Sequence, residues 1–218
     1  MRPKVIFHIE CSLDGRIDWL KPDQFVYYRV IQDWAIDAMI SGSNTILQAE
    51  MSLEKEIEKL SDQYLVVVDS RGRIDNWEVI KKQAWWNDTP IVLCSDSTPK
   101  SYLEKLQGQQ VHYLVHGENQ VNIREALESL NSIFGIRTMR IDSGGVLAGV
   151  MLRNQVVDEV SVIISPQLTG GTRPKSIFVA PDLESMVHVI DLDLIDCKIL
   201  DKNYIHLIYQ INKQEIFP

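Results

Sequence analysis

Short apolar runs alternate along the chain with stretches of helical periodicity. The runs that have the length and alternation of β-strands cover residues 4–9, 37–42, 64–70, 90–96, 111–116, 138–143 and 159–165. Between most of them, apolar residues recur at helical spacing, over residues 23–35, 101–107, 122–135 and 145–155. This alternation predicts an α/β fold with a mainly parallel central sheet flanked by helices.

The end of the chain follows a different pattern. Residues 186–200 and 203–212 form two long strand-like runs that are separated only by a short turn. There is no room for a crossover helix, so we expect an antiparallel C-terminal hairpin. No repeat, low-complexity tract or linker interrupts the sequence, so we expect a single domain over residues 1–218.

Composition excludes several classes of protein. The 218 residues are 45% hydrophobic and 24% charged, as in an ordinary soluble protein, and no secretion signal or long apolar run is present. We therefore expect a cytoplasmic protein that does not enter membranes. The net charge of −8 argues against nucleic acid as a partner. Three widely separated cysteines predict neither a disulfide framework nor a metal site.

Candidate chemistry begins with the stretch "IDSGGVLAG", residues 141–149. A strand that ends in Gly144 and Gly145, directly before a helix, leaves backbone N–H groups free where the helix dipole favours anions. The same pair also fits an ordinary tight turn. The stretch lacks G-x-G-x-x-G spacing and comes late in the chain, so a standard dinucleotide-binding arrangement is not predicted.

Three other predicted strands end in polar or glycine-rich residues, namely "CSLDGRID", "SGSNT" and "DSRGR". In parallel sheets such ends meet at one edge, where ligands bind. Thr45 fits either a phosphate contact or a helix cap. Ser70, Arg71 and Arg73 suit the extra phosphate that distinguishes NADP from NAD, or a solvated turn.

These segments, in this order, resemble a known family. The matching stretches are "RPKVIFHIECSLDGRID", "DAMISGSNTI", "VVVDSRGRI" and "MRIDSGGVLAGVMLRNQVVDEVSVIISPQLTGG". Together they are similar to the pyrimidine reductase domain of bacterial and archaeal riboflavin biosynthesis, whose fold is like that of dihydrofolate reductase. The resemblance implies NADPH as cofactor, a homodimer, and reduction of 5-amino-6-(5-phosphoribosylamino)uracil or a close relative.

The resemblance also assigns residues. Those implied to contact the cofactor, with the two arginines inferred above, are Glu10, Thr45, Ser70, Arg71, Arg73, Gly144, Gly145, Val146, Leu147 and Ala148. Ser12, Leu53 and Asp142 are the implied substrate contacts. Asp14 and Asp142 are our candidates for catalytic, proton-handling residues.

The chain departs from the family in its substrate half. Asp33 and Glu56 stand where typical members carry substrate-binding arginines, and a carboxylate there repels a ribose phosphate. Arg29, one helical turn from Asp33, is a possible substitute. Two alternatives therefore stay open: a reductase of another heterocycle or carbonyl compound without a ribose phosphate, and a nucleotide-binding relative without catalysis.

Overall fold

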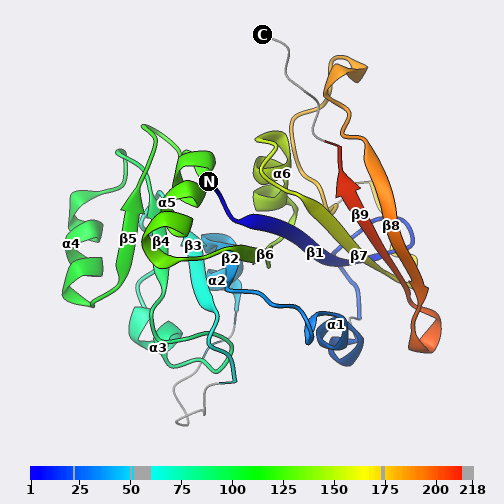
Figure 1. Cartoon of the computed structure of the whole chain (residues 1–218), viewed down its shortest axis with the longest axis horizontal. Helices are drawn as coiled ribbons and strands as arrows, with labels where there is room; N and C mark the ends of the chain where they lie inside the picture. Colours follow the sequence, from blue (N-terminus) through cyan, green and yellow to red (C-terminus); the bar gives the residue numbers. More distant parts are fainter. Residues whose placement is uncertain (22, 50, 52–59, 173–174, 213–218) are drawn as a thin grey trace. The chain divides into compact units, whose positions relative to one another are not determined.

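The computed structural model describes residues 1–21, 23–49, 51, 60–172 and 175–212, and it divides the chain into two compact units (Figure 1). The first unit comprises Met1–Lys4 and Ile36–Ser143, and the second comprises Val5–Ala35 and Gly144–Pro218. The expectation of a single domain over residues 1–218 stays a prediction. Within the described residues, no helix is long and apolar enough to cross a membrane.

Parallel strands form the centre of the first unit. They are β2 (Ala38–Gly42), β3 (Tyr64–Val68), β4 (Ile91–Cys94), β5 (His112–Val115) and β6 (Thr138–Ile141). Their order is β5-β4-β3-β2-β6, and every neighbouring pair is parallel. The carboxyl ends of β2, β3 and β6 therefore lie at one edge of the sheet.

Helices cover the sheet of the first unit. They are α2 (Ser43–Gln48), α3 (Trp77–Lys81), α4 (Lys100–Gly108) and α5 (Ile123–Phe134). Trp77 of α3 and Leu106 of α4 are fully buried against strand residues such as Leu65 and Val92. The sequence did not predict α3, because it is shorter than two turns and its periodicity is too brief to detect.

The ends of α5 agree with the sequence. The side chain of Asn122 accepts a hydrogen bond from the backbone N–H of Glu125 at 3.4 Å, which caps the first turn. Gly135 ends the helix with φ of 69°, a left-handed conformation that glycine adopts without steric cost. Both predicted helix boundaries are confirmed.

Parallel and antiparallel pairing meet in the second unit. Its strands are β1 (Lys4–Ser12, whose first residue belongs to the first unit), β7 (Glu159–Ser165), β8 (Leu192–Ile199) and β9 (Ile205–Ile211). β1 pairs with β7 in parallel, while β9 pairs antiparallel with both β7 and β8. The predicted α/β fold with mainly parallel pairing and an antiparallel C-terminal hairpin is confirmed.

Several boundaries in the second unit differ from the sequence prediction. Strand β1 continues to Ser12, three residues beyond its predicted end at residue 9. Helix α1 (Gln24–Ile31) is shorter than residues 23–35, because the chain turns where the backbone N–H of Trp34 bonds to the carbonyl of Ile31 at 3.1 Å. Strand β8 begins at Leu192, since Met186–His188 form a 3₁₀ turn instead. The other helix of the unit, α6 (Gly145–Arg153), lies where the sequence places it.

Candidate active site

In the first unit, hydrogen bonds join the carboxyl ends of β2 and β6. The Ser41 hydroxyl donates to the carbonyl of Asp142 at 2.7 Å, and the Gly42 backbone N–H donates to the Ser143 hydroxyl at 3.2 Å. The hydroxyls of Thr45 and Ser143 lie 3.0 Å apart. Two residues predicted from the sequence to act in the site, Thr45 and Asp142, are thus brought to the same edge of the sheet.

A buried carboxylate organises the turn after β3. Asp69 accepts hydrogen bonds from the backbone N–H of Arg73 at 2.8 Å and of Ile74 at 3.1 Å, and from the Tyr102 hydroxyl at 3.0 Å. Burial and the neighbouring Asp69 raise the pKa of Tyr102, so the phenol stays protonated and keeps donating. Gly72 has φ of 63° and packs directly on the Tyr102 ring, where a side chain would collide. The sequence pattern does not reveal Asp69 and Tyr102 as organising residues.

The two arginines of this turn have different surroundings. Arg73 donates to the Ser43 hydroxyl at 2.5 Å and to the Asn44 side chain at 2.8 Å, so it fastens the turn to the start of α2. Arg71 is exposed and makes no ion pair with any residue that the structure describes. Arg71, next to the half-buried Ser70, is therefore the guanidinium that can receive an anion.

Asp142, the residue that follows β6, is held by a side chain of that strand. Its carboxylate pairs with the guanidinium of Arg140 at 3.2 Å. The Arg140 side chain is buried, whereas that of Asp142 is one third exposed. The pairing orients the Asp142 carboxylate at the end of β6 and leaves part of it accessible to a ligand.

In the second unit, two adjacent glycines begin α6 in different environments. A Cβ on Gly145 would collide with the backbone carbonyl of Ser176, and one on Gly149 with that of Val179, so both glycines allow close packing of the chain. Among the described residues, a Cβ on Gly144 would meet only the Ile17 side chain, at 3.8 Å. Gly144 caps the helix without a side-chain hydrogen bond. Internal packing therefore explains Gly145 but leaves space beside Gly144 for a ligand.

The other α6 residues with predicted cofactor contacts differ in exposure. Val146 is exposed, while Leu147 and Ala148 are buried in the helix face that packs on the protein. Only the backbone N–H groups of the first turn are thus suited to contact an anion, and the helix dipole favours such a contact.

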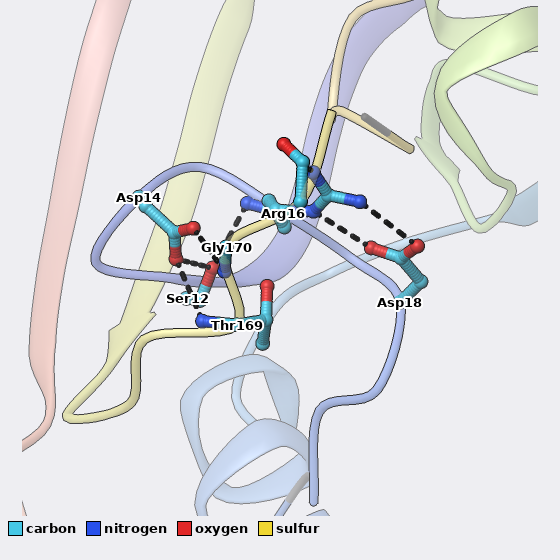
Figure 2. A network of polar contacts seen from close by, with 7 residues as sticks. Ser12, Asp14, Arg16, Asp18, Thr169 and Gly170 are labelled. Carbon is cyan, nitrogen blue, oxygen red and sulfur yellow. Dashed lines mark hydrogen bonds and ion pairs between the residues drawn. The ribbon is translucent and has the colours of Figure 1, made fainter. Parts of the chain in front are cut away.

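The turn after β1 is organised around Asp14 (Figure 2). Its carboxylate accepts hydrogen bonds from the Ser12 hydroxyl at 2.6 Å and from the backbone N–H groups of Thr169 at 3.1 Å and Gly170 at 2.8 Å. These bonds, Ser12 first, lower the pKa of Asp14 to about 2. Asp14 is therefore ionised at neutral pH, and it is suited to hold the turn rather than to donate a proton.

Arg16 closes the same turn from its other side (Figure 2). The buried guanidinium binds both carboxylate oxygens of Asp18, at 3.0 and 3.2 Å, and donates to the carbonyl of Gly171 at 3.2 Å. The backbone N–H of Arg16 donates to the Ser12 hydroxyl at 3.0 Å. Ser12, a predicted substrate contact, is thus buried and committed to the turn.

Glu10 has an unusual environment for a carboxyl group. It lies near the carboxyl end of β1, is 6% exposed, and neither of its oxygens has a hydrogen-bond partner among the described residues. Burial raises its pKa to about 7; the nearby Ser165 hydroxyl opposes this rise and the Asp23 carboxylate adds to it. Ser165 and Asp23 come close to Glu10 only through strand register and helix placement, which the sequence pattern does not reveal.

Some of the residues implied to contact the substrate, or at which the chain departs from the family, lie outside the described part of the structure. Leu53 and Glu56 lie outside the described residues. Asp33 is exposed in the turn that follows α1. Arg29, the possible substitute for a missing arginine, pairs with Asp201 at 2.5 Å on an exposed surface. No cluster of potential metal ligands occurs in the described part of the chain.

Each unit has a feature that defines a class of protein. Parallel strands whose carboxyl ends carry hydroxyls, in the first unit, and a helix that begins at an open glycine, in the second, are each typical of α/β proteins that bind nucleotides and other anionic small molecules. Residues 3–205 match the family described as the RibD C-terminal domain, and the chain belongs to that family. The resemblance to riboflavin-biosynthesis pyrimidine reductases is confirmed.

Curated relatives of similar length carry a reductase name. The chain is 26% identical over 204 residues to the 2,5-diamino-6-ribosylamino-4(3H)-pyrimidinone 5′-phosphate reductase of Methanothermobacter thermautotrophicus, which covers 89% of this chain and 92% of the relative. The reductase of the same name from Aquifex aeolicus is 22% identical over 207 residues, with 88% and 90% covered.

Solved structures support the fold. Acinetobacter baumannii RibD superposes with a TM-score of 0.73 at 22% identity; the match covers 97% of this chain but 58% of that chain. The riboflavin biosynthesis reductase Rib7 of Saccharomyces cerevisiae gives a TM-score of 0.70 at 18% identity, with 97% and 90% covered. The reductase relatives imply a nicotinamide cofactor for this family.

Proposed function

We propose that the chain is an NADPH-dependent reductase of a ribosylamino-pyrimidine 5′-phosphate. The observation that carries the proposal is the family match over residues 3–205, together with relatives of nearly equal length whose name states this reduction. A nicotinamide cofactor supplies the hydride for such a reaction. The protein itself must bind and orient the two molecules and exclude water.

The residues of the second unit fit a cofactor phosphate. Among the described residues, Gly144 leaves open space at the first turn of α6, and as the N-cap residue it has no side chain to bond to the N–H groups of that turn. Backbone N–H groups there donate to an anion in the direction that the helix dipole favours. In the first unit, the Thr45 hydroxyl at the start of α2 offers a further donor.

Arg71 supports NADPH over NADH. Arg73 is engaged with Ser43 and Asn44, so it holds the turn in place, while the exposed Arg71 beside Ser70 is available to the additional phosphate of NADPH. A charge-assisted hydrogen bond of this kind contributes about 1.5–3 kcal/mol.

A second candidate function concerns the substrate. Asp33 is exposed at the end of α1, and Arg29 is paired with Asp201, so this helix offers a phosphate more repulsion than attraction. A heterocycle without a ribose phosphate would avoid that repulsion.

Steady-state kinetics with the phosphorylated pyrimidine and its dephosphorylated form separates the two. We expect the phosphorylated compound to give the higher kcat/KM. A preference for the dephosphorylated form, with recovery of activity on the phosphate in Asp33→Arg, supports the second candidate instead.

A homodimer is proposed through β8. This strand pairs with β9 on one side, and Leu194, Ile195 and Ile199 are 55%, 52% and 84% exposed. An edge strand with exposed apolar side chains can pair with another chain, and a second copy presents the same edge. The cytoplasmic location and the absence of nucleic-acid partners stay predictions from the sequence.

A further inference from the structure

We propose that Glu10 is the acid that supplies a proton to the substrate, a role that rests on the proposed function. Reduction of a ribosylamine at C1′ forms a C1′–H bond from the hydride and breaks the bond between C1′ and the ring oxygen. The freed oxygen takes one proton and becomes a hydroxyl group. The cofactor gives up two electrons with the hydride, so the balance requires one further proton, which Glu10 supplies and solvent then restores to Glu10.

Glu10 lies near the end of its strand at which we expect a ligand to bind. It is two residues before the carboxyl end of β1, the end of a parallel strand at which α/β proteins bind ligands. Strand alternation places it on the same face as His8 and Ser12. Its side chain is more than nine-tenths buried, and both carboxyl oxygens lack a hydrogen-bond partner in the part of the chain that the structure describes. Buried polar groups are usually satisfied, so two orphan oxygens indicate a partner that comes from a ligand.

Burial, more than any neighbouring group, keeps the proton on Glu10. Asp23 brings a second negative charge, although Lys202 partly balances it through an ion pair at 2.5 Å. Tyr204 is buried nearby, and burial followed by Glu10 itself raises the pKa of its phenol. The Ser165 hydroxyl favours the ionised form of Glu10 without making a hydrogen bond of normal geometry. Glu10 is thus protonated for an appreciable fraction of molecules at neutral pH.

Deeper on the same face, a serine hydroxyl links two histidines. The Ser161 hydroxyl lies 2.9 Å from His8 Nδ1 and 2.7 Å from His206 Nε2, which joins three neighbouring strands. Burial first, and then Lys198, lower the pKa of His206. Asp196 on β8 opposes this shift. These contacts through Ser161 connect the strands of the sheet. We therefore assign proton delivery to Glu10 and not to the histidines.

The other carboxyl groups of the candidate site are less suited to this role. Asp14 is held ionised by three hydrogen bonds, and Asp142 is paired with Arg140. Glu10 alone among these three has neither a paired cation nor hydrogen-bond donors within the described residues.

Three variants of the full chain test the proposal: Glu10→Gln, which keeps the shape and removes the acid; Glu10→Asp, which keeps an acid; and the exposed control Glu184→Gln. With NADPH and the phosphorylated pyrimidine, we expect wild-type kcat to fall as pH rises above about 7, because the acid form is lost. Glu10→Gln should lower kcat by roughly 10²–10⁴-fold and remove this pH dependence, with KM little changed. Glu10→Asp should recover part of the rate, and Glu184→Gln should match wild type.

Stability provides a readout that needs no substrate. The pKa of Glu10 is higher in the folded protein than its ordinary value of 4.5, so the folded state holds the extra proton between that value and about 7. Wild-type stability should therefore decline over this range as pH rises, and Glu10→Gln should not show that decline. Denaturant unfolding at several pH values measures the difference.

The outcomes are distinguishable. An active wild-type enzyme whose Glu10→Gln variant keeps kcat and its pH profile would overturn the role of Glu10 alone. A wild-type protein that does not reduce the pyrimidine overturns the proposed function, and the proposed role of Glu10 with it. Identical pH dependence of stability in wild type and Glu10→Gln would contradict the buried environment on which the proposal depends.

Discussion

Two adjacent glycines at the start of α6 show how one residue type meets two requirements. Gly145 makes room for the backbone of Ser176, whereas in the described part of the chain only the tip of the Ile17 side chain lies near a Cβ placed on Gly144. We predict that Gly144→Val folds with nearly wild-type stability but loses cofactor binding, because its branched side chain fills the space that a phosphate needs.

The matched variant is Gly145→Val, which should lose stability by several kcal/mol through collision with the Ser176 carbonyl. Circular dichroism melting and a cofactor titration measure both properties. Normal cofactor affinity in a folded Gly144→Val protein would mean that this turn is only structural.

A second prediction for a single residue concerns Arg71 and the choice between NADPH and NADH. Arg71→Ala should weaken NADPH binding by roughly 10- to 100-fold and leave NADH binding unchanged, because only NADPH has the phosphate that the guanidinium receives. Calorimetry with both cofactors measures the effect. The exposed Lys82→Ala serves as control for a lost surface charge. Equal wild-type affinity for the two cofactors would sink the assignment.

Among the elements, the turn between β3 and α3 depends most on one side chain. Asp69 holds two backbone N–H groups and the Tyr102 hydroxyl. We predict that Asp69→Ala destabilises the fold by about 2–4 kcal/mol, because it leaves buried donors without acceptors. Urea unfolding measures the loss, and Asp96→Ala, at an exposed position, provides the control. A loss no larger than that of the control would show that Asp69 does not organise the turn.

The sequence predicted helices and strands better than it predicted contacts between side chains. Alternation revealed the strands, and the caps Asn122 and Gly135 were readable because their residue types have local roles. It could not reveal that Arg73 is occupied by Ser43 and Asn44, since these residues meet only through the pairing of β2 with β3. Helix α3 was not predicted, because it is too short for the helical spacing of its apolar residues to be detected.

The candidate site shows the same limit. The glycine turn before α6 and the D-S-R-G-R turn were visible as motifs, because glycine and charge patterns are local. The buried state of Glu10 was not visible, because it depends on tertiary packing, in which α1 contacts β7 and Tyr204. The ionised state of Asp14 depends in the same way on Thr169 and Gly170, which are distant in sequence.

For the whole molecule, β8 predicts the oligomeric state. Its exposed edge and apolar side chains should be covered by a second copy, so the wild-type protein should be a dimer. Ile195→Lys should shift the protein toward monomer, because the charged side chain resists burial at the edge. Light scattering after size-exclusion chromatography measures the mass. A wild-type monomer, or a dimer indifferent to the substitution, contradicts this interface.

The central claim is that the protein reduces a ribosylamino-pyrimidine 5′-phosphate with NADPH. The most direct measurement uses purified protein, the phosphorylated pyrimidine and NADPH deuterated at C4 of the nicotinamide, with the product examined by mass spectrometry and NMR. We predict a ribitylamino product that carries deuterium at C1′. Unchanged pyrimidine and unoxidised NADPH, or deuterium at another carbon, would contradict the account.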